Sequence, residues 1–468
     1  MSYREEKDTM GTVRIPGDAY YGAQTQRAVD NFPISNQTFP PVFIRALALI
    51  KECAAAVNAD LGLLDDRLAQ AIVQAAREIV QGKLGDQFVV DVFQTGSGTS
   101  TNMNMNEVLA TRANEILTQK KTSRSPVHPN DHVNQGQSSN DVVPTALHIS
   151  ALTAIRQTLT PALEKLHRIL VEKSTEFSDV QKLGRTHLQD AVPLTLGQEF
   201  SGYARQIALG LQRIAATEKQ LVELALGGTA VGSGLNAHPE FADRVIAMIS
   251  ERTGLAFVEA ENHFEAQAAR DAAVATSSQL KTLAVSLVKI ANDIRWLASG
   301  PRCGLGEINI PSLQPGSSIM PGKVNPVIPE MLLQVAAQVV GNDTAITVGG
   351  QSGNFELNVM IPLITHNLLQ SIQLLGSGVD VFAEKCIRGV TANRERCAAN
   401  IERSLAMVTG LVPHIGYEKS AAIAKKAYET GQTVREVALE QQIVSEELLN
   451  RILEPVDPGG KNDQKVSD

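Results

Sequence analysis

The sequence has no excess of basic residues, and this limits the partners that the protein can bind. It contains 42 Lys and Arg residues against 50 Asp and Glu residues, which gives a formal net charge of −8 over 468 residues. A protein that is held to nucleic acid by phosphate contacts needs a basic face. The charge balance therefore argues against a nucleic-acid partner, although it leaves room for a small basic pocket that binds a carboxylate substrate.

Cysteine pairs, targeting signals and long apolar runs are also missing. The first ten residues, MSYREEKDTM, have neither the basic start nor the apolar stretch of a targeting signal. No run approaches the roughly 18 apolar residues that a membrane helix needs. We therefore expect a soluble, cytoplasmic protein with no membrane partner. Its four cysteines lie far apart, without the CxxC spacing of a zinc site or redox dithiol, and are expected to be reduced thiols: Cys53, Cys303, Cys386 and Cys397.

The apolar pattern predicts a mainly α fold. Residues 1–40 are punctuated by glycine and proline and are expected to be irregular, whereas helical periodicity starts after Pro41. From Pro144 onward the sequence shows long amphipathic stretches that predict a helical bundle. The tail from Glu454 mixes proline, glycine and charge and is expected to be poorly ordered. The clearest stretch has a heptad-like spacing of apolar residues: Leu280, Leu283, Leu287, Ile290, Ile294 and Leu297.

Four polar segments interrupt the expected helices, and the first of them is TGSGTSTN at residues 95–102. Its glycines expose backbone N–H groups, and the hydroxyls of Ser97 and Thr99 add donors for an anion. Taken alone, the segment is more typical of a flexible loop that precedes a helix starting near Glu107.

The second segment is HPNDHVNQGQSSND at residues 128–141. His128 and His132 have the four-residue spacing of metal ligands on a helix, but the proline between them disfavours a helix and no further ligand set completes a site. We therefore expect no metal here. One of residues 139–141 is expected to cap a helix that begins around Pro144.

The third segment, GRTHLQDAVPLTLGQE at residues 184–199, places Thr186 and His187 beside an arginine in a polar turn. A helix is expected to open near Gln198. A lone histidine is more often structural than catalytic, but its ordinary pKa suits proton transfer near neutral pH.

The fourth segment is PGSSIMPGKVNP at residues 315–326, where two glycines and three prolines forbid a helix. A phosphate-binding loop is excluded because five residues separate the glycines and Val324 replaces the hydroxyl residue of that motif. A freely solvated linker would have no reason to carry Ile319 and Met320. The segment supplies hydroxyls, an amide and a positive charge ahead of the helix that contains Glu330: Ser317, Ser318, Lys323 and Asn325.

In this order and spacing, the four segments resemble the aspartase/fumarase superfamily, and within it the class II fumarate hydratases. The resemblance covers nearly the whole chain, and GSSIMPGKVNP is a specific signature of the superfamily. It implies a three-domain fold with a long central helical bundle. The expected domains are an N-terminal lyase domain at 1–138, the central bundle at 139–395, and a small C-terminal helical domain with a disordered tail at 396–468.

The resemblance also implies a homotetramer whose active sites are each built from three chains. The heptad-like seam at residues 280–297 supports this assembly, because it implies more partner helices than one bundle supplies.

The activity implied by the resemblance is the reversible hydration of fumarate to L-malate in the tricarboxylic acid cycle, without a metal or organic cofactor. Ser317 is then the base, and His187 with Glu330 assists the departure of hydroxide. The implied substrate-binding residues are Ser97, Gly98, Thr99, Ser138, Ser139, Asn140, Thr186, Ser318, Lys323 and Asn325. A second anion site is implied at His128, Asn130 and Asp131.

Two other functions compete with this interpretation. An aspartate ammonia-lyase would use the same carbanion chemistry, but such enzymes usually differ from this chain at Ser97, Ser139 and Gly322. A structural protein on the same fold should have lost at least one of the catalytic residues, and all are present. The chain departs from many fumarases at Val412 and His132, and at Ser125, where an arginine often stands near the second anion site.

Overall fold

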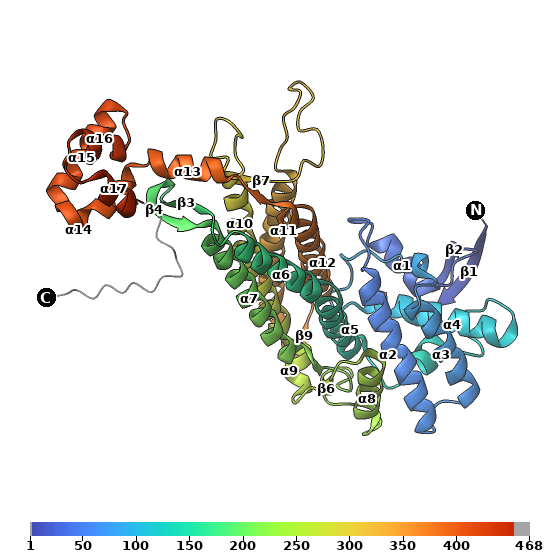
Figure 1. The fold of residues 1–468 in the computed structure, drawn as a ribbon. Helices are drawn as coiled ribbons and strands as arrows, with labels where there is room; N and C mark the ends of the chain where they lie inside the picture. The colour runs from blue at the N-terminus through green and yellow to red at the C-terminus, as the bar shows by residue number, and fades with distance from the viewer. Residues whose placement is uncertain (1, 454–468) are drawn as a thin grey trace. The chain divides into compact units, whose positions relative to one another are not determined.

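The computed structural model describes residues 2–453 and confirms a mainly α fold (Figure 1). Within this range the strands form only two-stranded sheets. The chain divides into two compact units. The first unit comprises the chain up to Pro161 together with Gly210–Ala284 and Val335–Ser377, and the second comprises Ala162–Leu209, Val285–Gln334 and the chain from Gly378 onward. The tail that was expected to be disordered, from Glu454, lies outside the described residues.

The N-terminal 40 residues of the first unit are more regular than the sequence indicated. Strands β1 (Tyr3–Asp8) and β2 (Gly11–Pro16) form an antiparallel hairpin, and α1 spans Ala23–Asn31. The expectation of an irregular segment was therefore wrong. Polar contacts stabilise this region, and an alternating apolar pattern does not mark it in the sequence. Arg4 donates to the carbonyl of Ala19 at 2.7 Å, and Arg27 pairs with Asp8 at 2.7 Å.

The helices predicted after Pro41 are present, because α2 spans Pro41–Asp60 and α3 spans Asp66–Val80, but α1 shows that helical structure starts earlier than predicted. Two later helices begin earlier than predicted. Helix α4 (Thr99–Thr118) starts directly after Gly98, whose φ of 79° ends the preceding loop. Helix α5 (Ser139–Ala154) is capped by Ser138 and encloses Pro144, because a capping box between Ser138 and Asp141 fixes its first turn.

Five long helices form the predicted bundle: α6 (Thr160–Glu176), α7 (Leu196–Leu221), α10 (Asp271–Leu297), α11 (Val327–Gly350) and α12 (Ile361–Lys385). Helices α7, α10, α11 and α12 each contribute residues to both units. The heptad-like seam is confirmed as a core stripe of α10, since all six of its residues are at most 4% exposed.

The second unit contains the hairpin of β3 (Gln181–Thr186) and β4 (Gln189–Thr195), which the sequence interpretation treated as a turn alone. Helix α7 starts at Leu196, two residues before the predicted position. Leu183 of β3 belongs to the core of the C-terminal helices. These helices are α13 (Arg394–Arg403), α14 (Val412–Ile415), α15 (Tyr417–Thr430), α16 (Val434–Glu440) and α17 (Glu446–Leu453).

Short elements connect the helices. The remaining ones are α8 (Phe241–Thr253), α9 (His263–Ala268), β5 (Glu223–Leu224), β6 (Val258–Glu259), β7 (Ile308–Asn309), β8 (Gly353–Asn354), β9 (Leu357–Asn358), β10 (Thr391–Ala392), a π-helical turn at Pro129–Val133 and 3-10 turns at Gly85–Gln87, Ile387–Gly389 and Leu405–Leu411. A second π-helical turn, Ile155–Leu159, joins α5 to α6.

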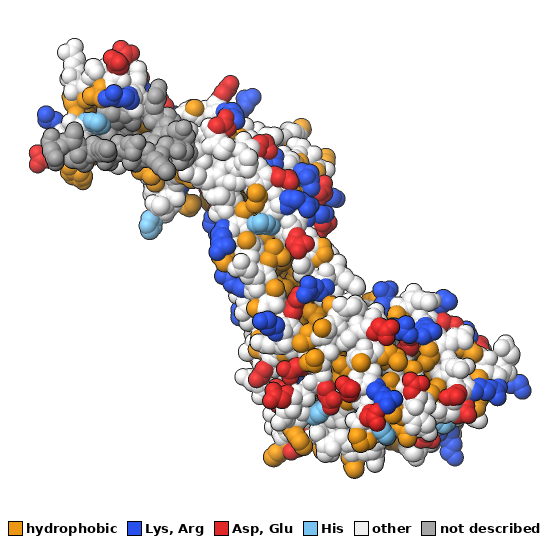
Figure 2. Space-filling model, turned by 60° about the horizontal axis from the view of Figure 1, so that its bottom comes forward, with side chains coloured by type: hydrophobic (Ala, Val, Ile, Leu, Met, Phe, Trp, Pro, Cys, Tyr) orange, Lys and Arg blue, Asp and Glu red, His pale blue; other side chains and the backbone are white. Residues whose placement is uncertain are grey.

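Charged side chains of both signs are interspersed on the face that Figure 2 shows, without a large field of one sign. None of the helices in the described range is long and apolar enough to cross a membrane.

Candidate active site

The segment at residues 315–326 is a closed loop that precedes α11 in the second unit. The N–H of Gly316 donates to the carbonyl of Lys323 at 2.8 Å, and the Asn325 amide donates to the carbonyl of Gly316 at 2.6 Å. A Cβ atom on Gly316 would lie 2.3 Å from the Lys323 carbonyl oxygen, so only glycine permits this closure. The predicted absence of a helix is confirmed.

Two backbone N–H groups of the loop point at the hydroxyl oxygen of Ser317. Ile319 donates to Ser317 Oγ at 3.2 Å and Met320 donates at 3.0 Å. These donors would stabilise negative charge on that oxygen. Ser318 and Lys323 are exposed, and Ile319 is 83% exposed in the chain. Ile319, which argued against a solvated linker in the sequence, is therefore exposed to solvent in a single chain.

Glu330 lies in the first turn of α11, directly after the loop, and is half-buried. Its backbone N–H donates to the carbonyl of Pro326 at 3.1 Å. The structure records no hydrogen bond between Glu330 and His187 within the described part of the chain.

Thr186 and His187 lie at the tip of the β3–β4 hairpin and are both exposed. His187 and Leu188 have φ values of 56° and 60°, the left-handed geometry of a tight hairpin turn. Figure 1 shows this hairpin and the loop between β7 and α11 well apart from each other in the second unit. No hydrogen bond or ion pair between the hairpin tip and this loop is recorded within the described part of the chain.

A buried carboxylate, Glu307, binds strand β3 directly before the tip of this hairpin. Arg185 donates to both oxygens of Glu307, at 2.7 and 2.9 Å, and Asn400 of α13 donates at 2.9 Å. The Glu307 side chain is fully buried, and the Lys182 ammonium lies 3.5 Å away. Burial alone would raise the pKa of Glu307, but these donors and charges outweigh it and lower the pKa below its ordinary value.

In the first unit, three predicted site residues form a chain of hydroxyl groups. Ser97 Oγ lies 2.8 Å from Thr99 Oγ1, which lies 2.6 Å from Ser139 Oγ. The glycine before Ser97 packs so closely that a Cβ atom there would lie 1.8 Å from the carbonyl oxygen of Val359. Segments about 40 residues apart in sequence thus converge on one polar patch, with Gly98 at the start of α4.

The start of α5 fixes the neighbouring residues of this patch. Ser138 Oγ accepts from the N–H of Asn140 at 3.2 Å, and the Asn140 amide donates to the carbonyl of Ala230 at 2.9 Å. Asp141 accepts from the N–H groups of Ser138 and Thr229, at 3.0 and 2.9 Å. Burial raises the pKa of Asp141 to about 6, although these N–H donors act in the opposite direction.

The histidine pair of the second segment forms a local turn. His128 Nδ1 accepts from the N–H groups of Asn130 and Asp131, at 3.3 and 3.2 Å, and His132 Nδ1 accepts from the N–H of His128 at 2.9 Å. In the described residues no group of three or more His, Cys, Asp or Glu side chains is placed to hold a metal ion. Arg124 lines a small hollow together with His128 and Asn130, so a guanidinium is present although Ser125 is not an arginine.

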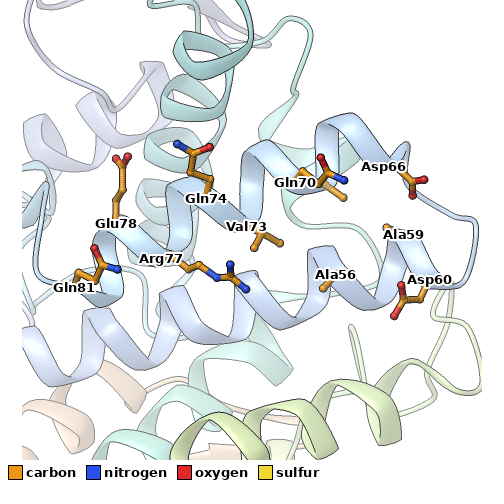
Figure 3. A pocket seen from close by; sticks show the side chains of 11 residues that line it. Ala56, Ala59, Asp60, Asp66, Gln70, Val73, Gln74, Arg77, Glu78 and Gln81 are labelled. Atoms are coloured by element: carbon orange, nitrogen blue, oxygen red, sulfur yellow. The ribbon is translucent and has the colours of Figure 1, made fainter.

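A larger hollow of about 790 Å³ lies between α2 and α3, but none of the predicted site residues lines it (Figure 3). Acidic residues Asp60 and Asp66 lie at one end of it, and Arg77 and Glu78 lie toward the other. None of the four polar segments lines this hollow, so we do not assign the active site to it.

Sequence interpretation missed several residues that support the site. The most informative is Lys51, whose signal was a Lys–Glu pair within the otherwise apolar run LALIKECAAAV. Asp141 ends the second quoted segment and Glu307 lies outside all four, and nothing in the sequence indicated which groups would donate to their carboxylates.

Comparisons with known proteins agree with this description. A family model described as lyase matches residues 11–341, and a model described as fumarase C C-terminus matches residues 407–457. The chain is 57% identical to a class II fumarate hydratase of Nitrosomonas europaea, over 97% of this chain and 98% of that protein. It is 52% identical to the mitochondrial fumarate hydratase 1 of Arabidopsis thaliana, over 99% of this chain and 94% of that protein.

A solved structure gives the same result. The class II fumarase of Schistosoma mansoni superposes with a TM-score of 0.93 at 41% identity, covering 97% of this chain and 98% of that one. The chain therefore belongs to the class II fumarate hydratase family of the aspartase/fumarase superfamily.

Proposed function

We infer that this chain is a hydro-lyase, a carbon–oxygen lyase that interconverts fumarate and L-malate. The observation that carries the conclusion is its high identity to class II fumarate hydratases over nearly the full chain, with the signature loop at residues 315–326 intact. Ser97, Ser139 and Gly322 argue against the alternative, aspartate ammonia-lyase.

The difficult step in the dehydration of malate is the removal of a proton from the carbon beside a carboxylate, because the resulting aci-carboxylate carries two negative charges. We propose that Ser317 removes this proton. A serine hydroxyl is ordinarily far too basic to exist as an alkoxide, so the protein must stabilise its charge. The N–H groups of Ile319 and Met320 supply this stabilisation through their hydrogen bonds to Ser317 Oγ.

The departure of the malate hydroxyl group requires an acid, since hydroxide is a poor leaving group. We propose that His187, paired with Glu330 and a water molecule, gives a proton to the departing hydroxyl. The exposed hairpin tip makes His187 available to a substrate or to a neighbouring chain.

Substrate carboxylates require several donors and one positive charge. The hydroxyl chain of the first unit and the amide of Asn140 fit one carboxylate, while Lys323 offers the charge that best meets the developing aci-carboxylate. The proposed binding set is Ser97, Gly98, Thr99, Ser138, Ser139, Asn140, Thr186, Ser318, Lys323 and Asn325. These groups and the loop amides supply the electrostatic stabilisation, so we propose that no metal or organic cofactor takes part.

A second anion site is proposed at His128, Asn130 and Asp131. The guanidinium of Arg124, which lines the same hollow as His128 and Asn130, supports it, while the carboxylates of Glu6 and Glu107 in that hollow oppose it. Asp131 is largely exposed and would repel an anion unless it turned toward solvent.

We further propose a homotetramer in which neighbouring chains complete each active site. The separation of the His187 hairpin from the Ser317 loop supports this, as do the exposed apolar side chains Ile319 and Trp296. The proposed domains are 1–138, 139–395 and 396–468, and the match of the fumarase C C-terminal model to residues 407–457 supports the last of them. A cytoplasmic location, with a role in the tricarboxylic acid cycle, fits four free cysteines.

The ultraviolet absorbance of fumarate provides the test. Purified protein should form fumarate from L-malate, with or without a chelator, and should form none from L-aspartate. Fumarate from L-aspartate alone would establish the ammonia-lyase instead, and loss of activity in a chelator, restored by a divalent ion, would overturn the metal-free mechanism.

A further inference from the structure

A buried lysine lies beneath the turn that leads to the proposed substrate residues of the first unit. Lys51 occupies the middle of α2 and is 0% exposed. Its ammonium donates to Asn134 Oδ1 and to Gln137 Oε1, both at 2.9 Å. Neither acceptor is a backbone group, so the lysine does not cap a helix or complete a sheet.

Asn134 connects this lysine to a second helix. Its Oδ1 atom also accepts from the side-chain amides of Asn102 and Asn106 of α4, at 3.2 and 3.1 Å. Its own amide donates to the carbonyl of Gln137 at 3.0 Å, which closes the turn. The turn at residues 134–137 is thus fixed from α2 and α4 at once.

The turn continues directly into Ser138, Ser139 and Asn140. On its far side Asp141, which is also 0% exposed, accepts from the N–H groups of Ser138 and Thr229. Lys51 therefore holds one end of the segment through Asn134 and Gln137, and Asp141 holds the other through the N–H of Ser138. Ser138, Ser139 and Asn140 lie between these contacts, which restrict the conformation of their backbone.

A lysine is a costly choice for this place. Removing an ammonium from water is unfavourable unless it gains partners, and an apolar side chain would fill the same volume without that cost. Burial lowers the pKa of Lys51 to about 7. The stabilising gain is in the side-chain oxygen of Gln137, which an apolar residue at position 51 would leave unpaired, and in a third donor to Asn134 Oδ1.

We propose that Lys51 is a positioning residue, which orients the turn at residues 134–140 so that Ser138, Ser139 and Asn140 meet a substrate carboxylate. The inference rests on the proposed function of these three residues. Lys51 itself does not touch the substrate, and its effect travels through Asn134 and Gln137.

Lys51→Met keeps the length of the side chain and removes its charge and donors. We expect the KM for fumarate and for L-malate to rise about tenfold or more, with a smaller fall in kcat, because binding groups are displaced. Lys173→Met is the matched control. Lys173 is 9% exposed and donates to Glu176 and to the carbonyl of Val390 in the second unit, so its loss should lower stability and leave KM unchanged.

A double variant separates positioning from general damage. If Lys51 acts through the turn, the KM of the double variant Lys51→Met, Ser139→Ala should be close to that of Ser139→Ala alone. If the two residues act independently, the two increases in KM would multiply. Gln137→Met removes one acceptor from a half-buried position and should shift KM in the same direction even if Lys51→Met does not fold. An unchanged KM in the folded variants, or multiplying effects, would overturn the inference, whereas an inactive wild-type protein would overturn the proposed function instead.

Discussion

The buried carboxylate that binds β3 next to the tip of the His187 hairpin offers a sharp test of the contacts that position His187. Glu307 receives two hydrogen bonds from Arg185 and one from Asn400, and its side chain is fully buried. Glu307→Ala would leave the Arg185 guanidinium, itself only 15% exposed, without its partner. Breaking a buried ion pair from one side costs about 3–5 kcal/mol, because a charge remains desolvated and unpaired.

We therefore expect Glu307→Ala to lower the free energy of unfolding by about 3–5 kcal/mol and to reduce turnover. Urea unfolding followed by circular dichroism measures the first effect, and initial rates measure the second. Replacing both partners, with Arg185→Leu and Glu307→Leu, should recover much of the stability because no guanidinium is left buried without a partner, and Lys182 keeps its contact with Glu199 at 3.0 Å. It should not recover turnover, since the hairpin loses its polar anchor.

The chain offers a matched control in the same unit. Arg394 makes the same two-pronged contact to Asp179, at 3.0 and 2.9 Å, but both side chains are more than half exposed. Asp179→Ala should leave the unfolding midpoint unchanged within error, because water screens an exposed pair. Equal effects of Asp179→Ala and Glu307→Ala would show that burial does not set the strength of the pair and would refute the reasoning.

Three further predictions concern the loop and the pH response. Ser317→Ala should lower kcat at least a thousandfold with KM changed little, because the hydroxyl acts on the C3 proton, and near-native rates would remove serine from the role of base. Gly316→Ala should lower kcat about tenfold or more in initial-rate assays, since its Cβ atom would meet the Lys323 carbonyl at 2.3 Å, and full activity would show that the loop closes differently. The pKa of Glu307 is lowered on folding, so its contribution is present above its ordinary pKa of 4.5 and is lost as the pH falls through the folded value. Thermal unfolding should therefore show a smaller acid-induced loss of stability in Glu307→Gln than in wild type, and identical losses would contradict this assignment.

The helices and the loops that interrupt them could be predicted well from the sequence. The seam from Leu280 to Leu297 is entirely buried because its spacing matches the period of a helix. The loop at residues 315–326 is not helical because its prolines and glycines forbid it. Both features depend on local chemistry, which the sequence displays directly.

The supporting contacts could not be predicted in this way. Lys51 lies more than 80 residues from Asn134 and Gln137, and the sequence holds no sign of which distant amides a buried lysine contacts. The N-terminal hairpin was missed because its sequence lacks an alternating apolar pattern. Arg4 and Arg27 stabilise it through polar contacts instead. Long-range polar pairing depends on the folded arrangement of the helices.

We propose that each active site combines His187 and Ser317 from different chains. The test mixes two inactive variants, Ser317→Ala and His187→Asn, in equal amounts after proven subunit exchange. If random assembly draws the two residues from different chains, about one quarter of the sites receive both intact groups, and about a quarter of wild-type activity should return. If both residues came from one chain, every site would keep one defect, and the absence of any recovered activity would contradict the account.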